Sequence, residues 1–189
     1  MRPNKREAIL KAEVAIIDDA GPDALTYESL AARSGFSKSG LVYHFPSREE
    51  LMLAIHAYLA ESWEQELLRA AGVEDVTQLS EAERLRAVVL SFSTAASLPE
   101  LLLQIEAVRH PEAAAIWRAV DERWMPKPAT ILDGPTRRAA YLVQLMADGL
   151  FLHDHLHVTP LTREQRAALT EAVLQLIPTP EDPGPLARG

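Results

Sequence analysis

The chain has 189 residues, of which 48% are apolar and 24% charged, and it contains no cysteine. This length and composition are typical of a folded core and exclude a disordered chain, while the absence of cysteine excludes disulfides, thiolate metal sites and a cysteine nucleophile. No apolar run is long enough to cross a membrane, and the basic start lacks the apolar stretch of a secretory signal, so we expect a soluble, cytoplasmic protein with no membrane partner.

The net charge is −8, but the charges are unevenly distributed. Residues 1–48 carry seven Lys/Arg against six Asp/Glu, whereas residues 49–189 carry 12 against 21. No acidic residue occurs from Ser29 to Arg48. If the protein binds a polyanion, the N-terminal part is therefore where we expect it to bind.

Helical periodicity and capping residues recur in the N-terminal part. Apolar residues predict a first helix through residues 9–17, which Gly21 ends in a left-handed conformation. Thr26 caps a second helix that is expected to run to Ser34, and Ser37 caps a short third helix over residues 38–44.

The same pattern continues to the C-terminal part. Capping boxes open helices after Ser47, Ser80 and Thr162. The expected helices run from 48 to about 71, from 81 to about 92, and over 99–109, 111–125, 136–157 and 163–177. No strand-like alternation is present, so the sequence predicts an all-α fold of about nine helices, and the proline-rich residues 179–189 are expected to be disordered.

Residues 26–45 form a short helix, a turn at Gly35 and a second short helix. This spacing is typical of a helix-turn-helix, whose second helix lies in the major groove of DNA. Groups suited to phosphates or base edges occur at Ser37, Lys38, Ser39, Tyr43, His44 and Arg48, and Gly40 allows a close approach of the backbone. The alternative is an ordinary helical corner.

Four motifs distinguish this region: Gly21-x-x-x-Leu25-Thr26, Leu30-Ala31-Ala32-x-x-Gly35-Phe36-Ser37, Gly40-Leu41-x-Tyr43-His44-Phe45 and Ser47-Arg48-x-Glu50-Leu51. Together, in one ungapped stretch, they resemble the N-terminal domain of the TetR/AcrR family of transcriptional repressors. Two residues depart from the family pattern: Phe36, where a small β-branched residue is usual, and Arg48, where Lys is common. Neither departure removes a charge or a hydrogen-bond donor.

The resemblance implies an all-helical homodimer that represses transcription from a palindromic operator in double-stranded DNA and is released by a small-molecule effector. It implies a DNA-binding domain at residues 1–47 and a ligand-binding and dimerisation domain at residues 48–178. By the same resemblance, the positions expected at DNA are Thr26, Lys38, Ser39, Gly40, Tyr43, His44 and Arg48. The residues expected to pack inside the DNA-binding domain are Leu30, Ala31, Phe36, Leu41 and Phe45.

The last two predicted helices are apolar over more than one face, which requires burial on both sides. They can form the core of the ligand-binding and dimerisation domain. The resemblance favours instead a four-helix dimer interface, made with the same two helices of a second copy. The residues expected at this interface are Leu142, Leu145, Phe151, Leu169, Val173 and Leu176.

A pocket for a small hydrophobic effector is expected among the middle helices. The candidate apolar lining residues are Phe92, Leu102, Ile105, Trp117, Trp124, Leu145 and Met146, and the polar residues expected to orient a ligand are Glu106, Arg109, Gln144 and Asp148. The alternative for each of them is a place in the plain core or, for the charged ones, on a solvated face.

His153 and His157 share a helix face and could both ligate a metal, but no third ligand is evident, and the helix dipole favours His near a C-terminus. We therefore assign no metal. Two alternatives stay open: an all-α metal-dependent hydrolase or metal-binding protein that uses this pair, and a helical interaction protein without DNA binding. Glycine-rich phosphate loops and a nucleophile elbow are missing, so we expect no enzyme, no catalytic residue and no cofactor.

Overall fold

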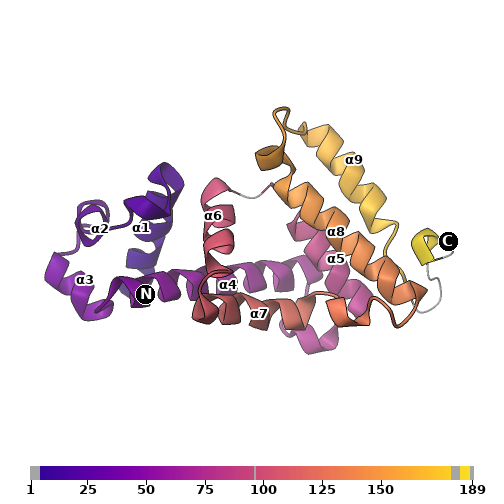
Figure 1. The fold of residues 1–189 in the computed structure, drawn as a ribbon, viewed down its shortest axis with the longest axis horizontal. Coiled ribbons are helices and arrows are strands. Elements are labelled where there is room, and N and C mark those ends of the chain that lie inside the picture. The colour runs from indigo at the N-terminus through magenta and orange to yellow at the C-terminus, as the bar shows by residue number, and fades with distance from the viewer. Residues whose placement is uncertain (1–4, 96, 180–183, 188–189) are drawn as a thin grey trace. The chain divides into compact units, whose positions relative to one another are not determined.

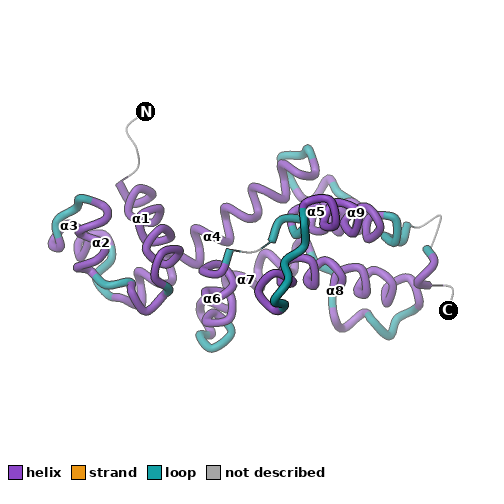
Figure 2. The backbone as a smooth tube through the Cα atoms, turned by 90° about the horizontal axis from the view of Figure 1, so that it is seen from above, coloured by secondary structure: helices purple, strands orange, loops and turns teal. Residues whose placement is uncertain are grey.

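The computed structural model describes residues 5–95, 97–179 and 184–187 (Figure 1). Within these ranges the regular structure consists of nine α-helices and four short 3-10 helices, and no strand is present. Figure 2 shows these helices and the loops that join them. The predicted all-α fold is confirmed. In this part of the chain, no helix is both long enough and apolar enough to span a membrane.

The α-helices are α1 (Lys5–Ala20), α2 (Tyr27–Ser34), α3 (Lys38–His44), α4 (Arg48–Ala71), α5 (Glu81–Ser91), α6 (Leu98–Ala107), α7 (Pro111–Trp124), α8 (Pro135–Leu156) and α9 (Arg163–Leu174). The 3-10 helices are η1 (Pro22–Ala24), η2 (Val76–Gln78), η3 (Pro128–Thr130) and η4 (Pro185–Ala187). Helix α9 ends earlier than the expected residue 177. Gln175 is its C-cap and residues 175–176 form a turn, while Pro178 disfavours the helical conformation at Ile177.

The helix ends follow the local rules that the sequence indicated. Thr26, Ser80 and Thr162 form reciprocal capping boxes: each side chain accepts a hydrogen bond from the third backbone N–H of its helix, and each backbone N–H donates one to the side chain of that third residue. Before α4, the backbone N–H of Glu50 donates to the Ser47 hydroxyl at 3.1 Å. The ends of the helices are thus encoded locally.

The helices pack into two compact units. The N-terminal unit comprises Met1–Ser62 and Ser97–Arg118, and the C-terminal unit comprises Trp63–Ala96 and Ala119–Gly189. The expected domain boundary between residues 47 and 48 stays a prediction.

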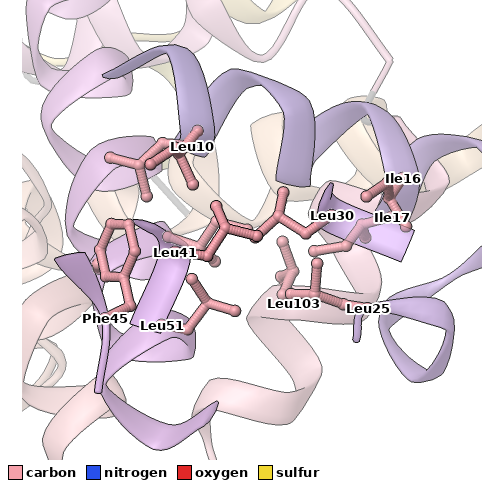
Figure 3. Close-up of a cluster of buried hydrophobic side chains, with 12 residues drawn as sticks. Leu10, Ile16, Ile17, Leu25, Leu30, Leu41, Phe45, Leu51 and Leu103 are labelled. Atoms are coloured by element: carbon pink, nitrogen blue, oxygen red, sulfur yellow. The ribbon is translucent and has the colours of Figure 1, made fainter. Parts of the chain in front are cut away.

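The core of the N-terminal unit is a cluster of buried aliphatic side chains and one phenylalanine from α1 to α4 (Figure 3). Leu30, Leu41 and Phe45 belong to it, and Ala31 and Phe36 pack against it. Leu103 of α6 is also part of this cluster and is only 1% exposed. Residues that are far apart in the sequence therefore complete the core of the helix-turn-helix.

The core of the C-terminal unit is built from α5, α8 and α9, which contact one another. Three aromatic rings stack in series there: Trp63 on Phe92, with ring centroids 5.7 Å apart, and Phe92 on Phe151, at 4.6 Å. Helix α9 is joined to α8 by the ion pair of Arg166 and Asp154, at 2.9 Å. These contacts fix the two last helices against each other.

The expected disordered tail falls partly outside the described residues, which exclude 180–183 and 188–189. Among residues 184–187, Gly184 is buried and η4 packs against α8, and disorder of the tail stays a prediction.

Candidate nucleic-acid interface

Helices α2 and α3 are joined by a tight turn at Gly35. Its φ of 73° is in the left-handed region, which glycine adopts without strain, and its N–H donates to the carbonyl of Ala31 at 3.1 Å. The Tyr27 hydroxyl donates to the carbonyl of Phe45 at 2.5 Å and so joins the start of α2 to the end of α3. The turn and this bond hold α3 in a defined orientation.

The outer surface of α3 exposes most of the residues predicted to contact DNA. Tyr43 is 83% exposed, Lys38 and Ser39 are exposed, and the His44 ring lies edge-on to Tyr43 with centroids 5.4 Å apart. Sequence reasoning missed Val42, which is 40% exposed on the same helix. The helical spacing of four residues from Lys38 could have identified it.

The smaller predicted residues at the start of α3 are engaged in its N-terminal cap. The Ser37 hydroxyl accepts from the Gly40 N–H at 3.1 Å and lies 3.2 Å from the Ser39 hydroxyl. A Cβ at Gly40 would lie 3.1 Å from the Ser37 hydroxyl oxygen, which is a crowded contact. Glycine at this position therefore protects the helix cap as well as leaving room for a close approach.

Lys38 forms an ion pair with Glu28 of α2. The hydrogen bond from Lys38 lowers the pKa of Glu28, so this carboxylate is ionised at neutral pH. This lysine, which is expected at DNA, is therefore held by an acidic neighbour within the same unit.

Thr26 and Arg48 lie far apart in the sequence but line one 340 Å³ hollow of the N-terminal unit. Thr26 accepts from the Ser29 N–H at 3.0 Å as the cap of α2, and Arg48 is exposed as the first residue of α4. The structure thus brings together two of the residues that are expected at DNA.

The residues predicted to line an effector pocket divide between the two units. Leu102, Ile105, Glu106 and Trp117 belong to the N-terminal unit, and Phe92, Trp124, Leu145, Met146 and Asp148 to the C-terminal unit. Of the second group, Leu145 and Met146 are exposed, whereas Phe92 and Trp124 are buried. Trp124 lines a 710 Å³ cavity. Its indole N–H donates a hydrogen bond to the Glu64 carboxylate at 3.0 Å, and the same carboxylate accepts one from the Arg123 guanidinium.

A polar pair on α8, Gln144 and Asp148, lies within the C-terminal unit. The Gln144 amide donates to Asp148 at 2.7 Å, and the amide oxygen of Gln144 is buried without a hydrogen-bond partner among the described residues. Desolvation raises the pKa of Asp148, and desolvation together with the charge of Asp148 raises the pKa of Asp121 to about 6. Gln144 and Asp148 were both expected from the sequence to orient a ligand, whereas Asp121 was not.

The predicted interface residues do not all face outward. Leu142, Leu145 and Leu169 are exposed and Leu176 is half-buried. Phe151 and Val173 are buried inside the C-terminal unit, because Phe151 stacks on Phe92 and both side chains belong to the core. The surface available to a second copy is therefore carried by the other four residues, with Met146 beside them on α8.

His153 and His157 lie together near the end of α8, with ring centroids 4.5 Å apart. Asp154 is adjacent, with a carboxylate oxygen 3.2 Å from His153 Nδ1, but it already accepts from the Leu161 N–H and pairs with Arg166. Over the described ranges, no group of three or more His, Asp or Glu side chains is arranged to hold a metal. The metal-dependent alternative gains no third ligand here.

Two family profiles match the chain. One is described as "Bacterial regulatory proteins, tetR family" and matches residues 9–55, and the other as "Tetracyclin repressor-like, C-terminal domain" and matches residues 82–178. Among curated proteins, the transcriptional regulator BetI of Rhizobium meliloti is 26% identical over 90% of this chain and 88% of its own length. RutR of Escherichia coli K12 is 34% identical, over 31% of this chain and 28% of its own length.

Solved structures share the fold. A TetR-family member from Streptomyces coelicolor A3, SCO1917, superposes with a TM-score of 0.61 at 20% identity and covers 94% of this chain and 100% of that one. The multidrug binding protein EbrR in complex with ethidium gives a TM-score of 0.59 at 20% identity, covering 93% and 100%.

Proposed function

This chain belongs to the TetR family of bacterial regulatory proteins, and from that membership we propose that it represses transcription as a homodimer on a palindromic operator. It is a DNA-binding transcriptional regulator that responds to an effector. In this proposal the protein acts in the cytoplasm and by binding alone, with no catalytic step.

The observation that carries the operator proposal is the exposed surface of α3. Tyr43 projects into solvent from a helix whose other face is fixed by Leu41 and Phe45 in the core. A large, exposed aromatic hydroxyl beside Lys38 and Ser39 is suited to phosphate and base contacts in a major groove. We propose that Thr26, Tyr43 and Arg48 contact phosphates and set the register. In the same proposal, Lys38, Ser39 and His44 contact base edges. The backbone at Ser37 and Gly40 lies close to the DNA.

Dimerisation is proposed through the exposed apolar face of α8 and α9. Leu142, Leu145, Met146 and Leu169 are exposed in the single chain, and Leu142, Leu145 and Met146 follow helical spacing along α8. An exposed apolar face of this kind is typical of a surface that a second copy covers. Two copies would place two α3 helices on one palindrome, about one helical turn of DNA apart.

The effector is proposed to be a small hydrophobic molecule that binds the C-terminal unit near Phe92, Trp124 and Asp148. Support comes from the aromatic stack and from the buried, unpartnered amide oxygen of Gln144 beside Asp148, since apolar walls with few polar groups are typical of ligand sites. EbrR, which has this fold, is complexed with ethidium and with malachite green in solved structures.

The operator proposal is tested by selecting bound duplexes from a random DNA pool with the purified protein and sequencing them. Enrichment of an inverted repeat is the expected result, and the selected duplex then serves to screen small molecules for release. A folded protein that enriches no sequence, even after any co-purified small molecule has been removed, contradicts the proposal.

The dimer proposal is tested by sedimentation of Leu145→Glu, whose charge would lie on the proposed interface. We expect a monomer and loss of operator binding, since each half-site alone is bound weakly. Leu132→Glu is the matched control, because Leu132 is 88% exposed and lies before α8. Equal dimerisation of both variants would contradict this interface.

A further inference from the structure

A second cavity lies wholly within the N-terminal unit, beside the first half of α4. It has a volume of 440 Å³, which is in the range of about 300–1,000 Å³ typical of small-molecule sites. Its apolar walls include Met52, Leu53, Pro111 and Ala113. Glu106, one of the residues predicted to line an effector pocket, lies in its wall.

His56 supplies a buried hydrogen-bonding group in this cavity. The residue is 2% exposed, and its Nδ1 accepts a 3.2 Å hydrogen bond from the indole N–H of Trp117. Burial, and then the charge of His110, lowers the pKa of His56, so the ring is neutral at pH 7 and carries its proton on Nε2. No hydrogen bond to Nε2 is present among the described residues, although the ring lines the cavity. An N–H donor on a buried ring is therefore available to a ligand in the cavity.

The charges around the cavity favour a positive ligand. Glu49, Glu106 and Glu112 line it against the single guanidinium of Arg48. His110 also lines the cavity, and its Nε2 lies 3.9 Å from the Glu106 carboxylate. Three carboxylates beside an apolar wall attract a cation and repel an anion.

We propose that this cavity is a binding site for a small organic cation that also carries a hydrogen-bond acceptor. The acceptor takes the proton of His56 Nε2, the ammonium lies near Glu106, and the apolar part packs against Met52 and Leu53. The site is separate from the effector site proposed for the C-terminal unit. Arg48 lines both this cavity and the hollow at Thr26, so a bound cation would lie next to a residue proposed to contact phosphate.

Two related probes test the proposal without DNA, so that its outcome is independent of the operator. Procaine carries an ester carbonyl and a charged diethylammonium group, and benzocaine is the ethyl ester of the same aminobenzoate without that group. Binding is followed by NMR of the three tryptophan indole N–H signals, and Trp117 is assigned with Trp117→Phe. We expect procaine to shift the Trp117 signal and to bind at least about threefold more tightly than benzocaine.

Three variants locate the site. Glu106→Gln is expected to weaken procaine about threefold and to leave benzocaine unchanged, because it removes only a charge. His56→Asn keeps an acceptor for Trp117 but removes the Nε2 donor, and it is expected to weaken both probes about fivefold. Glu61→Gln, which is exposed on α4 and outside the cavity, is the control and should bind both probes as the unmodified protein does.

Three results would each overturn the proposal. The first is an unchanged Trp117 signal with procaine in large excess. The second is equal affinity for the charged and neutral probes. The third is equal weakening of procaine by Glu106→Gln and Glu61→Gln, which would show a general effect of surface charge.

Discussion

The hydroxyl of Tyr27 donates a hydrogen bond to the backbone carbonyl of Phe45, 18 residues further along the chain. Tyr27 is the first residue of α2 and Phe45 is the C-cap of α3, so the bond closes the helix-turn-helix at the side opposite its Gly35 turn. The orientation of α3 therefore depends on one tyrosine hydroxyl that is not itself expected to contact DNA.

Tyr27→Phe removes this bond and leaves the ring. We expect the free energy of unfolding to fall by about 1 kcal/mol, because the Phe45 carbonyl loses its partner in a partly buried place. Urea unfolding measures this change. Tyr141→Phe is the control, since the Tyr141 hydroxyl makes no hydrogen bond over the described ranges and its loss should leave the midpoint unchanged. Equal midpoints for both variants would mean that the Tyr27 bond contributes nothing.

Glu28→Gln should increase affinity for DNA of any sequence. Glu28 is ionised and paired with Lys38, so it both repels phosphate and restrains the lysine. Because the pair is exposed, the expected gain is about threefold at low salt and vanishes as salt rises. Fluorescence anisotropy with a random duplex measures it, with Glu74→Gln in the C-terminal unit as control. A gain that persists at high salt would point to another cause.

The Tyr43→Ala and Lys38→Ala substitutions should change DNA binding in two different ways. Loss of a phosphate contact at Tyr43 weakens specific and random duplexes alike, whereas loss of base readout at Lys38 changes which sequence is preferred. Selection of random duplexes by each variant separates the two effects. The base-readout assignment fails if Lys38→Ala loses the same factor on both kinds of DNA.

Glu13 makes the stability of the N-terminal unit depend on pH. Its side chain is fully buried in α1, neither carboxylate oxygen has a hydrogen-bond partner among the described residues, and burial raises its pKa to about 8. Because the folded-state pKa lies above the ordinary value of 4.5, the unfolded chain releases the proton first, and stability is lost from about pH 4.5 up to about pH 8.

Glu13→Gln should abolish that loss. We expect the urea midpoint of the unmodified protein to fall relative to that of Glu13→Gln as the pH rises from 5 to 8, and the difference to become constant above about pH 8. Glu7→Gln is the control, because Glu7 is exposed and paired with Lys11. Parallel pH profiles for the protein and Glu13→Gln would refute a raised pKa.

Local physics made much of the fold predictable. Thr26, Ser80 and Thr162 cap their helices as the sequence indicated, since a cap needs only a side-chain oxygen within three residues of a free N–H. Gly35 adopts the left-handed conformation for an equally local reason. The all-α fold and the family follow from such patterns and are confirmed.

What the sequence did not reveal depends on which helices pack together. Phe151 could face a core or a partner, and only the stack on Phe92 places it inside. His56 and Trp117 are 61 residues apart, and no periodicity indicates their hydrogen bond. The sequence shows the charge of Lys38 but does not indicate its ion pair with Glu28, because that pair forms between two helices.

The side chain of Leu103 completes the core of the helix-turn-helix from a helix that begins more than fifty residues after α3 ends. The helix-turn-helix therefore lacks part of its core when α6 is absent. A chimera that transplants residues 1–62 onto another body would leave a hole where this leucine sits, at a cost of about 2–5 kcal/mol by analogy with large-to-small core substitutions. Exchange of this helix-turn-helix with that of a relative should therefore require that α6 is transferred with it.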